Sequence, residues 1–317
     1  MKTERPWYAQ GARELSGSAH RNSDCHHDRL LLMLQTELRF TIDTAREAGN
    51  LILEHYAREI IAEEKLGADN FYEPVTAADR DASALIVERI AAAYPDDAVL
   101  SEEAADDSET RLSKRRSWIV DPIDGTAGFV KKDGDFSVQI GLADGPEAVL
   151  GVVFMPFHNV LYYSSKGDGA FAIHGDSEPV PMHVSDQRDF REMRLALTKN
   201  HYSEKMAAII EAFGFASKVR RGSVGLKIGL IAEQECDIYI HPSPRTKLWD
   251  TCAPQIILEE AGGKLTDLFG SPFRYDIADV QNHNGILATN GISHDSAVEH
   301  LKPVLSQLGR YRVITAK

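Results

Sequence analysis

The chain has 317 residues, enough for one large domain or two small ones, and its 43% hydrophobic and 26% charged residues are ordinary for a globular protein. The formal net charge of −13 argues against a general nucleic-acid binder and against a membrane-surface protein, because both need a basic face. A small phosphorylated substrate stays open, since bound cations reverse the sign of the charge locally.

Cysteine usage and targeting signals indicate a reducing compartment. The three cysteines, Cys25, Cys236 and Cys252, are far apart in the sequence and form no C-x-x-C motif. No amino-terminal segment has the order of a signal peptide, and the run "LLLML" at residues 30–34 is too short to span a membrane. We therefore expect a cytoplasmic protein with no membrane partner.

The amino-terminal segment differs from the rest of the chain. Residues 1–29 are polar and aperiodic, which predicts a flexible extension. No later stretch has the composition of an interdomain linker. We therefore expect a single domain over residues 30–317, with an amino-terminal half over about 38–190 and a carboxy-terminal half over about 191–317.

The first half of the domain is predicted to open with two helices. Residues 38–65 carry apolar side chains at helical spacing, and Gly49 is a point at which this helix is expected to break. Residues 79–95 predict a second helix that ends at a proline. Short apolar runs at 98–100 and 117–120 predict strands.

An antiparallel meander is predicted next. The runs "SVQIGLA", "AVLGVVFMP", "NVLYYSS" and "GAFAI" are strand-like and are separated by Gly, Pro or Asn turns. The second half then alternates. Strands are predicted at "RLALTKN", "CDIYIH" and "GILATN", and helices at "SEKMAAIIEAFG", "GLKIGLIAEQE", "WDTCAPQIILEEAGG" and "HDSAVEHLKPVLSQL". This order predicts a layered domain of mixed α/β or α+β class.

Two aspartates lie three residues apart in "WIVDPIDGTAGF", straight after an apolar run. Asp121 follows the predicted strand, at the end where ligands gather in open α/β sheets, and we expect it to form a compact turn with Asp124. Two buried carboxylates this close repel each other, and a hard divalent cation such as Mg²⁺ removes that penalty. The alternative is an Asp-Pro turn in which Asp121 is a simple cap.

Other acidic residues follow apolar runs or open predicted helices in the same way: Glu102, Glu103, Asp250 and Asp79. Asp250 and Asp79 could each be N-caps. Taken together, the pattern favours a shared acidic cleft over several unrelated caps. The sequence has no P-loop, EF-hand loop, G-x-S-x-G elbow or H-E-x-x-H motif, and its D-x-x-D spacing differs from the D-x-D of haloacid-dehalogenase-like phosphatases.

These residues resemble the inositol monophosphatase family of Mg²⁺-dependent, lithium-sensitive phosphomonoesterases. The resemblance rests on "PVTAADR" (74–80), "SEE" (101–103), "DPIDGT" (121–126) and "WD" (249–250), in that order. It extends over nearly the whole chain after the extension. It implies the sugar-phosphatase fold, which is an α-β-α-β-α layered sandwich.

The resemblance also implies a set of metal ligands. Glu102, Asp121 and the backbone carbonyl of Ile123 would hold a first Mg²⁺, and Asp121, Asp124 and Asp250 would hold a second. Two or three ions per active site are expected. Such ions neutralise phosphoryl oxygens, lower the pKa of the attacking water and stabilise the leaving oxygen.

The catalytic residues implied by the resemblance are Asp79, Thr126 and Glu102. Thr126 and Asp79 would orient and deprotonate the attacking water, and Glu102 would assist through its metal ion. Gly125 would let the backbone approach the phosphate, and the N–H groups after Thr126 would help to hold it. No covalent intermediate is required.

Within the family, the stretches 124–142 and 243–254 favour the 3'(2'),5'-bisphosphate nucleotidase branch, the CysQ-like proteins. Ala127 departs from that branch, which has a lysine there, and residues 198–200 match it loosely. A second phosphate needs further cations, for which Lys227, Arg245 and Lys247 are candidates; a solvated basic loop is the alternative reading of these residues. The resemblance implies that the substrate contacts Gly125, Thr126, His201, Gly222, Ser223, Lys227 and Asp250.

The sequence therefore predicts a phosphomonoesterase that removes the 3'-phosphate of adenosine 3',5'-bisphosphate by means of metal-activated water. One alternative substrate is inositol-1-phosphate or another sugar phosphate. A catalytically inactive metal-binding regulatory protein is the alternative of a different class. The expected partner is a small phosphate ester, with no nucleic acid, and a homodimer is common in such families.

Overall fold

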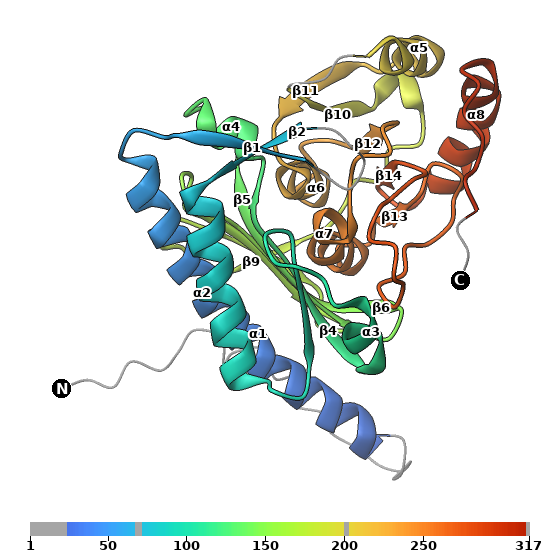
Figure 1. Cartoon of the computed structure of the whole chain (residues 1–317). Coiled ribbons are helices and arrows are strands. Elements are labelled where there is room, and N and C mark those ends of the chain that lie inside the picture. The colour runs from blue at the N-terminus through green and yellow to red at the C-terminus, as the bar shows by residue number, and fades with distance from the viewer. Residues whose placement is uncertain (1–23, 67–71, 200–202, 315–317) are drawn as a thin grey trace.

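The secondary-structure elements form five layers, α-β-α-β-α, as Figure 1 shows. The computed structural model describes residues 24–66, 72–199 and 203–314. A seven-stranded and a five-stranded sheet make the two β layers, and helices lie outside and between them. This arrangement confirms the predicted mixed α/β class and the layered sandwich.

The larger sheet contains the predicted meander. Its first two strands, β3 and β4, are parallel, and every later pair of neighbours is antiparallel. Its strands, in spatial order, are β3 (Ala98–Ser101), β4 (Arg116–Asp124), β5 (Ser137–Asp144), β6 (Glu147–Met155), β7 (Val160–Ser165), β8 (Ala170–His174) and β9 (Val180–Met182).

The smaller sheet is mixed. Its strand β10 is parallel to β11 and to β12, whereas β14 is antiparallel to β12 and β13. Its strands, in spatial order, are β11 (Ser217–Arg221), β10 (Arg194–Thr198), β12 (Ile238–His241), β14 (Ile286–Thr289) and β13 (Lys264–Thr266). The sequence patterns predicted β10, β12 and β14 but missed the strands β11 and β13.

Helices cover both faces of the larger sheet. Helices α1 (Asp24–Tyr56) and α2 (Ala77–Ala93) pack on one face, and α6 (Val224–Ala232) and α7 (Leu248–Glu260) lie between the two sheets. Helices α5 (Glu204–Phe213) and α8 (His294–Gln307) cover the outer face of the smaller sheet. The short helices are α3 (Ser108–Ser113), α4 (Thr126–Val130) and η2 (Phe190–Glu192).

Helix α1 begins earlier than predicted and does not break. Residues 24–29, which the sequence pattern assigns to the extension, belong to this helix, because no glycine or proline interrupts the chain between Asp24 and Ala48. Residues 1–23 lie outside the described part of the chain. The predicted break at Gly49 is wrong: this glycine lets the helix approach the sheet, since a Cβ there would overlap the Phe154 ring.

The prediction that the first helix continues to residue 65 is also wrong. The helix ends at Tyr56, and the chain then forms the antiparallel pair β1 (Ala62–Leu66) and β2 (Tyr72–Thr76). The helical spacing of apolar residues continues past Tyr56, but Ile61 there is 76% exposed and packs into no core. Residues 62–66 form a strand because they pair with β2, which comes later in the chain. The local spacing of apolar residues does not reveal this pairing.

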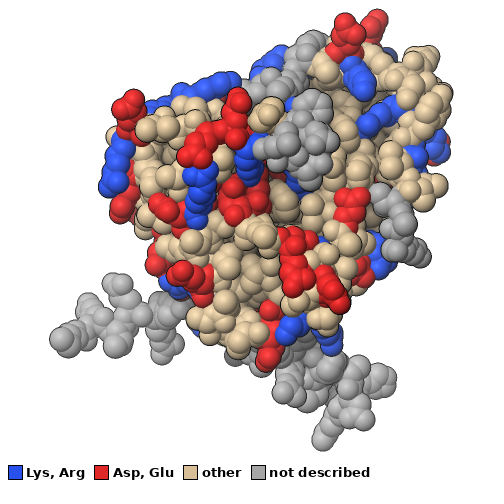
Figure 2. Space-filling model, viewed as in Figure 1, with Lys and Arg blue, Asp and Glu red and all other residues tan. Residues whose placement is uncertain are grey.

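Two surface properties bear on partners. No helix in residues 24–66, 72–199 and 203–314 combines the length and the apolar character needed to cross a membrane. On the face shown in Figure 2, acidic and basic side chains are interspersed. The excess negative charge is therefore not gathered into one continuous patch on that face.

Candidate active site

Strand β4 brings its two aspartates together through an irregularity in the sheet. Asp121 pairs with Gln139 and Asp124 with Ser137, and the register shifts between them as at a β-bulge. Pro122 has no N–H for the ladder, so regular pairing fails at this point. Residues three apart on a regular strand face opposite sides, whereas the bulge re-aims one of them. The predicted turn is thus a bulge within the strand.

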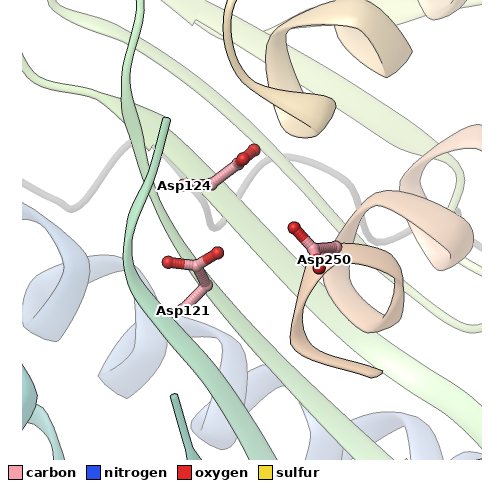
Figure 3. A group of neighbouring side chains, drawn as sticks. All are labelled: Asp121, Asp124 and Asp250. Carbon is pink, nitrogen blue, oxygen red and sulfur yellow. The ribbon is translucent and has the colours of Figure 1, made fainter. Parts of the chain in front are cut away.

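A third carboxylate joins them from the first turn of helix α7. Carboxylate oxygens of Asp121, Asp124 and Asp250 lie within 4.8 Å of one another, and Figure 3 shows the three side chains facing a common space. Asp250 is not an N-cap. It is the third residue of the helix, and its Oδ2 accepts a hydrogen bond from the backbone N–H of Lys247 at 2.6 Å.

The electrostatics of this cluster favour a bound cation. Burial, followed by the charges of Glu102, Asp124 and Asp250, raises the pKa of Asp121 well above its ordinary value. Burial, followed by the neighbouring charges of Asp124 and Glu102, raises the pKa of Asp250 to about 8. The Oδ1 atom of Asp121 is buried and has no hydrogen-bond partner. A hard divalent cation fits this site, because it supplies both the missing partner and the missing positive charge.

Asp124 is oriented by groups from both halves of the chain. Its Oδ2 accepts hydrogen bonds from the side chains of Gln139 and Ser223, and from the backbone N–H of Gly225 at 2.9 Å. Burial raises its pKa, while the charge of Lys227 and these hydrogen bonds oppose the shift. The Oδ2 atom of Asp124 is thus fixed by three hydrogen-bond donors. Gln139 was missed by the sequence analysis, since a buried glutamine in a strand gives no functional signal.

Glu102 lies beside the cluster and is paired with a lysine. Its charge raises the pKa of Asp79, Asp121 and Asp250, although its oxygens are not in the group within 4.8 Å. The Nζ atom of Lys65, on β1, donates to Glu102 Oε1 at 2.8 Å and also to Glu103. Burial opposes the charge of Lys65, yet the two glutamates raise its pKa above the ordinary value. The sequence analysis missed Lys65 because it assigned β1 to a helix.

Asp79 and Thr126 form a pair next to the carboxylate cluster. The Oγ1 atom of Thr126 lies 3.1 Å from Asp79 Oδ1 and 3.1 Å from the carbonyl oxygen of Ile123, so its proton can go to either. Asp79 Oδ2 accepts hydrogen bonds from the N–H and the hydroxyl of Thr76, at 2.8 and 2.6 Å. Asp79 is therefore the third residue of α2 in a capping box and not its N-cap. Burial raises its pKa.

Gly125 is required by the backbone at the start of α4. Its φ is +98°, and a Cβ there would lie 2.7 Å from the backbone oxygen of Asp135. We expect Gly125→Ala to lower the free energy of unfolding by about 1–3 kcal/mol and to reduce activity. Gly145→Ala is the matched control, because Gly145 has a φ of +58° with nothing within 4 Å of an added Cβ. Equal losses in the two variants, measured by chemical unfolding, would contradict the role of the close contact.

Of the residues expected to contact the substrate, Ser223 reaches the carboxylate cluster, whereas Lys227 is buried behind the loop that carries Gly222. Ser223 is bonded to Asp124, and its neighbour Gly222 donates its N–H to Asp135 at 3.1 Å. Lys227 is buried; its Nζ donates to Gly222 O at 3.0 Å and lies 5.0 Å from the centroid of the Tyr239 ring. Burial lowers the pKa of Lys227 to about 8. The predicted contact of His201 lies outside the described residues.

Comparisons with known proteins show that the chain is a hydrolase of phosphate monoesters. The sequence model of the Inositol monophosphatase family matches residues 33–306. The chain therefore belongs to the inositol monophosphatase family. Enzymes of this family depend on a metal ion, generally Mg²⁺.

Individual relatives give finer likenesses. The chain is 33% identical over 231 residues to the 3'(2'),5'-bisphosphate nucleotidase CysQ of Escherichia coli, covering 73% of this chain and 90% of that protein. It is 31% identical over 274 residues to a fructose-1,6-bisphosphatase/inositol-1-monophosphatase of Thermotoga maritima, covering 86% and 98%. The crystal structure of CysQ from Bacteroides thetaiotaomicron matches with a TM-score of 0.68 at 30% identity, covering 82% and 99%.

The stability of the metal-free protein is expected to fall as the pH rises from about 4 to about 8. The folded pKa values of Asp121 and Asp250 are raised, so above the ordinary carboxyl pKa the unfolded state holds fewer protons than the folded state. The loss should reach at least about 1 kcal/mol, or roughly 2–4 °C in Tm. Thermal unfolding across this pH range, once in chelator and once in Mg²⁺, measures the change in Tm. The Tm should vary less with pH when Mg²⁺ is present. A metal-free Tm that rises through this range would contradict the prediction.

Proposed function

We propose that the protein removes the 3'-phosphate of adenosine 3',5'-bisphosphate by attack of water on phosphorus. The observation that carries the proposal is the cluster of Asp121, Asp124 and Asp250, with one orphaned buried oxygen, beside the Asp79–Thr126 pair. The likeness to CysQ proteins supports the nucleotide as the substrate.

The proposed metal ligands fit the donor set at the site. Glu102, Asp121 and the carbonyl of Ile123 would hold one Mg²⁺, and Asp121, Asp124 and Asp250 would hold another. When bound, such ions neutralise the phosphoryl oxygens and acidify water. The orphaned oxygen of Asp121 is an atom that remains for them.

The protein's own residues would handle the proton and the phosphate. Thr126 would orient the attacking water, and Asp79 would take up the proton that the water loses, by way of the Thr126 hydroxyl. Burial raises the pKa of Asp79, which makes its carboxylate a better base. Gly125, with no side chain, would leave room for a phosphoryl oxygen at the start of α4. The loop of Gly222 and Ser223 would contact the rest of the substrate. The Nζ atom of Lys227 stabilises this loop by donating to the carbonyl oxygen of Gly222.

Inositol-1-phosphate or another sugar phosphate is a second candidate substrate. The named activities of the Thermotoga maritima relative, which matches 86% of this chain, favour it. An inactive metal-binding protein is disfavoured, since every proposed ligand and the Asp79–Thr126 pair are present. We also propose a cytoplasmic location, a homodimer and inhibition by lithium as expectations from the family resemblance.

A phosphate-release assay across four substrates tests the proposal. Adenosine 3',5'-bisphosphate, adenosine 3'-monophosphate, inositol-1-phosphate and fructose 1,6-bisphosphate should be compared with and without Mg²⁺. We expect the highest kcat/KM for adenosine 3',5'-bisphosphate. A higher kcat/KM for inositol-1-phosphate or fructose 1,6-bisphosphate would contradict the nucleotide proposal and favour a sugar phosphate as the substrate. No Mg²⁺-dependent release from any of them would leave the inactive protein as the better explanation.

A further inference from the structure

We propose that Gln139 is a positioning residue of the cation site, an inference that rests on the proposed function. Its side-chain N–H holds Asp124 in place, and its carbonyl oxygen accepts a hydrogen bond from the hydration water of a bound divalent cation. Gln139 lies in the middle of β5 and is 0% exposed. It carries no charge and is not among the metal ligands that the sequence predicts.

Strand β5 places Gln139 opposite Asp121. The two residues are register partners in the antiparallel pair of β4 and β5. Residues directly opposite each other in such a pair project to the same face, with Cβ atoms roughly 4.5–5.5 Å apart. Gln139 also reaches Asp124, beyond the register shift, because its Nε2 donates to the Oδ2 atom of that carboxylate. One neutral side chain therefore lies beside two of the three carboxylates.

The same face of β5 also contacts the two helices that lie between the sheets. Residues two apart on a strand share a face, so Ser137, Gln139 and Gly141 form one row. The Oγ atom of Ser137 lies 2.9 Å from the Oγ atom of Ser223, the N-cap of α6. A Cβ at Gly141 would lie 2.6 Å from the Sγ atom of Cys252 on α7. Close contacts on both sides of Gln139 therefore fix the strand, and its amide, beside the cluster.

The chemistry of Asp124 decides which end of the Gln139 amide faces it. An ionised carboxylate only accepts hydrogen bonds, and Asp124 Oδ2 accepts them from Gln139, from the hydroxyl of Ser223 and from the N–H of Gly225. Rotating the amide by half a turn would place its carbonyl oxygen against this carboxylate oxygen, and two acceptors repel each other. The amide nitrogen therefore faces Asp124, and the carbonyl oxygen needs a partner elsewhere.

The carbonyl oxygen of Gln139 is buried and has no hydrogen-bond partner. The Oδ1 atom of Asp121, on the opposite residue, is also buried without a partner. Both atoms are acceptors, so neither can satisfy the other. An unsatisfied buried acceptor costs about 1–3 kcal/mol, a cost that a methionine of similar length would avoid. A ligand that brings both positive charge and hydrogen-bond donors to this place would remove the cost at both atoms.

A hydrated divalent cation is such a ligand. Mg²⁺ takes oxygen ligands and usually keeps several of its water molecules when a protein binds it. The charge of the ion suits Asp121, and a water O–H suits the neutral amide oxygen of Gln139. A carboxylate in place of the amide would add a fourth negative charge to the repulsion within the cluster, whereas glutamine offers an oxygen without that charge.

Calorimetry of Mg²⁺ binding in the absence of substrate tests this role. We expect Gln139→Met to weaken Mg²⁺ binding by about 10- to 100-fold, as is typical when a group that orients metal ligands is removed. Gln255→Met is the matched control, because Gln255 is 7% exposed and bonds to Glu259 and Tyr275 instead of the cluster. Its Mg²⁺ affinity should not change. The rise in Tm on adding Mg²⁺ gives a second measure of affinity, which serves even for a destabilised variant.

Ser223→Ala separates the two ends of the Gln139 amide. This substitution removes another donor to Asp124 Oδ2, and the side-chain cap of α6 with it, while the carbonyl oxygen of Gln139 stays. Gln139→Met should therefore weaken Mg²⁺ binding more than Ser223→Ala does. An equal or smaller loss in Gln139→Met would overturn the proposal, because holding Asp124 would then account for the whole effect.

The other outcomes separate this inference from the proposed function. A wild type and a Gln139→Met variant that bind Mg²⁺ equally well would overturn the role of Gln139 and leave the proposed function intact. A wild type that binds no Mg²⁺ would overturn the proposed metal site and the role of Gln139 together. Equal losses of affinity in Gln139→Met and Gln255→Met would reduce the effect to the loss of a buried amide and would also overturn the inference.

Discussion

Asp121→Asn is expected to lower kcat/KM for phosphate release by at least about 10³-fold. The substitution removes one charge from the three-carboxylate cluster and replaces one carboxylate oxygen by an amide nitrogen, so both metal affinity and stabilisation of transition-state charge should suffer. Steady-state kinetics at saturating Mg²⁺, with calorimetry of Mg²⁺ binding, measures the two effects separately.

The same variant should be more stable than the wild type when metal is removed. Neutral asparagine relieves the repulsion that raises the pKa of Asp121 and of its neighbours. A higher Tm in chelator together with lost activity would separate function from folding. Asp176→Asn, at an exposed position, is the control and should change neither quantity. Activity within tenfold of the wild type would contradict the assignment of Asp121 as a metal ligand.

Asp79→Asn is expected to lower kcat by about 10²- to 10⁴-fold while leaving Mg²⁺ binding nearly unchanged. The amide oxygen of asparagine can still accept the hydrogen bonds from Thr76 that cap α2, but the side chain no longer takes up a proton. Steady-state kinetics measures the loss of kcat, calorimetry measures Mg²⁺ binding, and thermal unfolding checks that the helix cap keeps the fold stable.

The pH profile adds a readout that a structural role of Asp79 would not change. The acidic limb of kcat against pH should be lost in Asp79→Asn, since that limb reports protonation of the base. Asp81→Asn is the control on the same helix, where Asp81 is exposed and lies 3.0 Å from His55. An unchanged kcat in Asp79→Asn would remove Asp79 from the reaction.

Local patterns in the sequence predicted most of the fold. The strands of the meander alternate with glycine, proline or asparagine turns, and each pairs with its neighbour in sequence, so short-range signals were sufficient. Helix α7 was marked by its glycine pair at the carboxyl end. The errors fell where a distant partner decides, as in the β1–β2 pair, and where an uninterrupted helical stretch was read as an extension.

The sequence by itself determined which acidic residues to group, because Asp121, Asp124 and Asp250 stand in the motifs "DPIDGT" and "WD", on which the family resemblance rests. Only the tertiary structure decided how they meet. The bulge in β4 turns two aspartates into one space, and the packing of α7 on the sheet adds the third. The pairing of Lys65 with Glu102 likewise joins two distant segments, strand β1 and the residue that follows β3. Such contacts join residues far apart in the chain, and their geometry is set by sheet register and helix packing, which no local pattern of residues encodes.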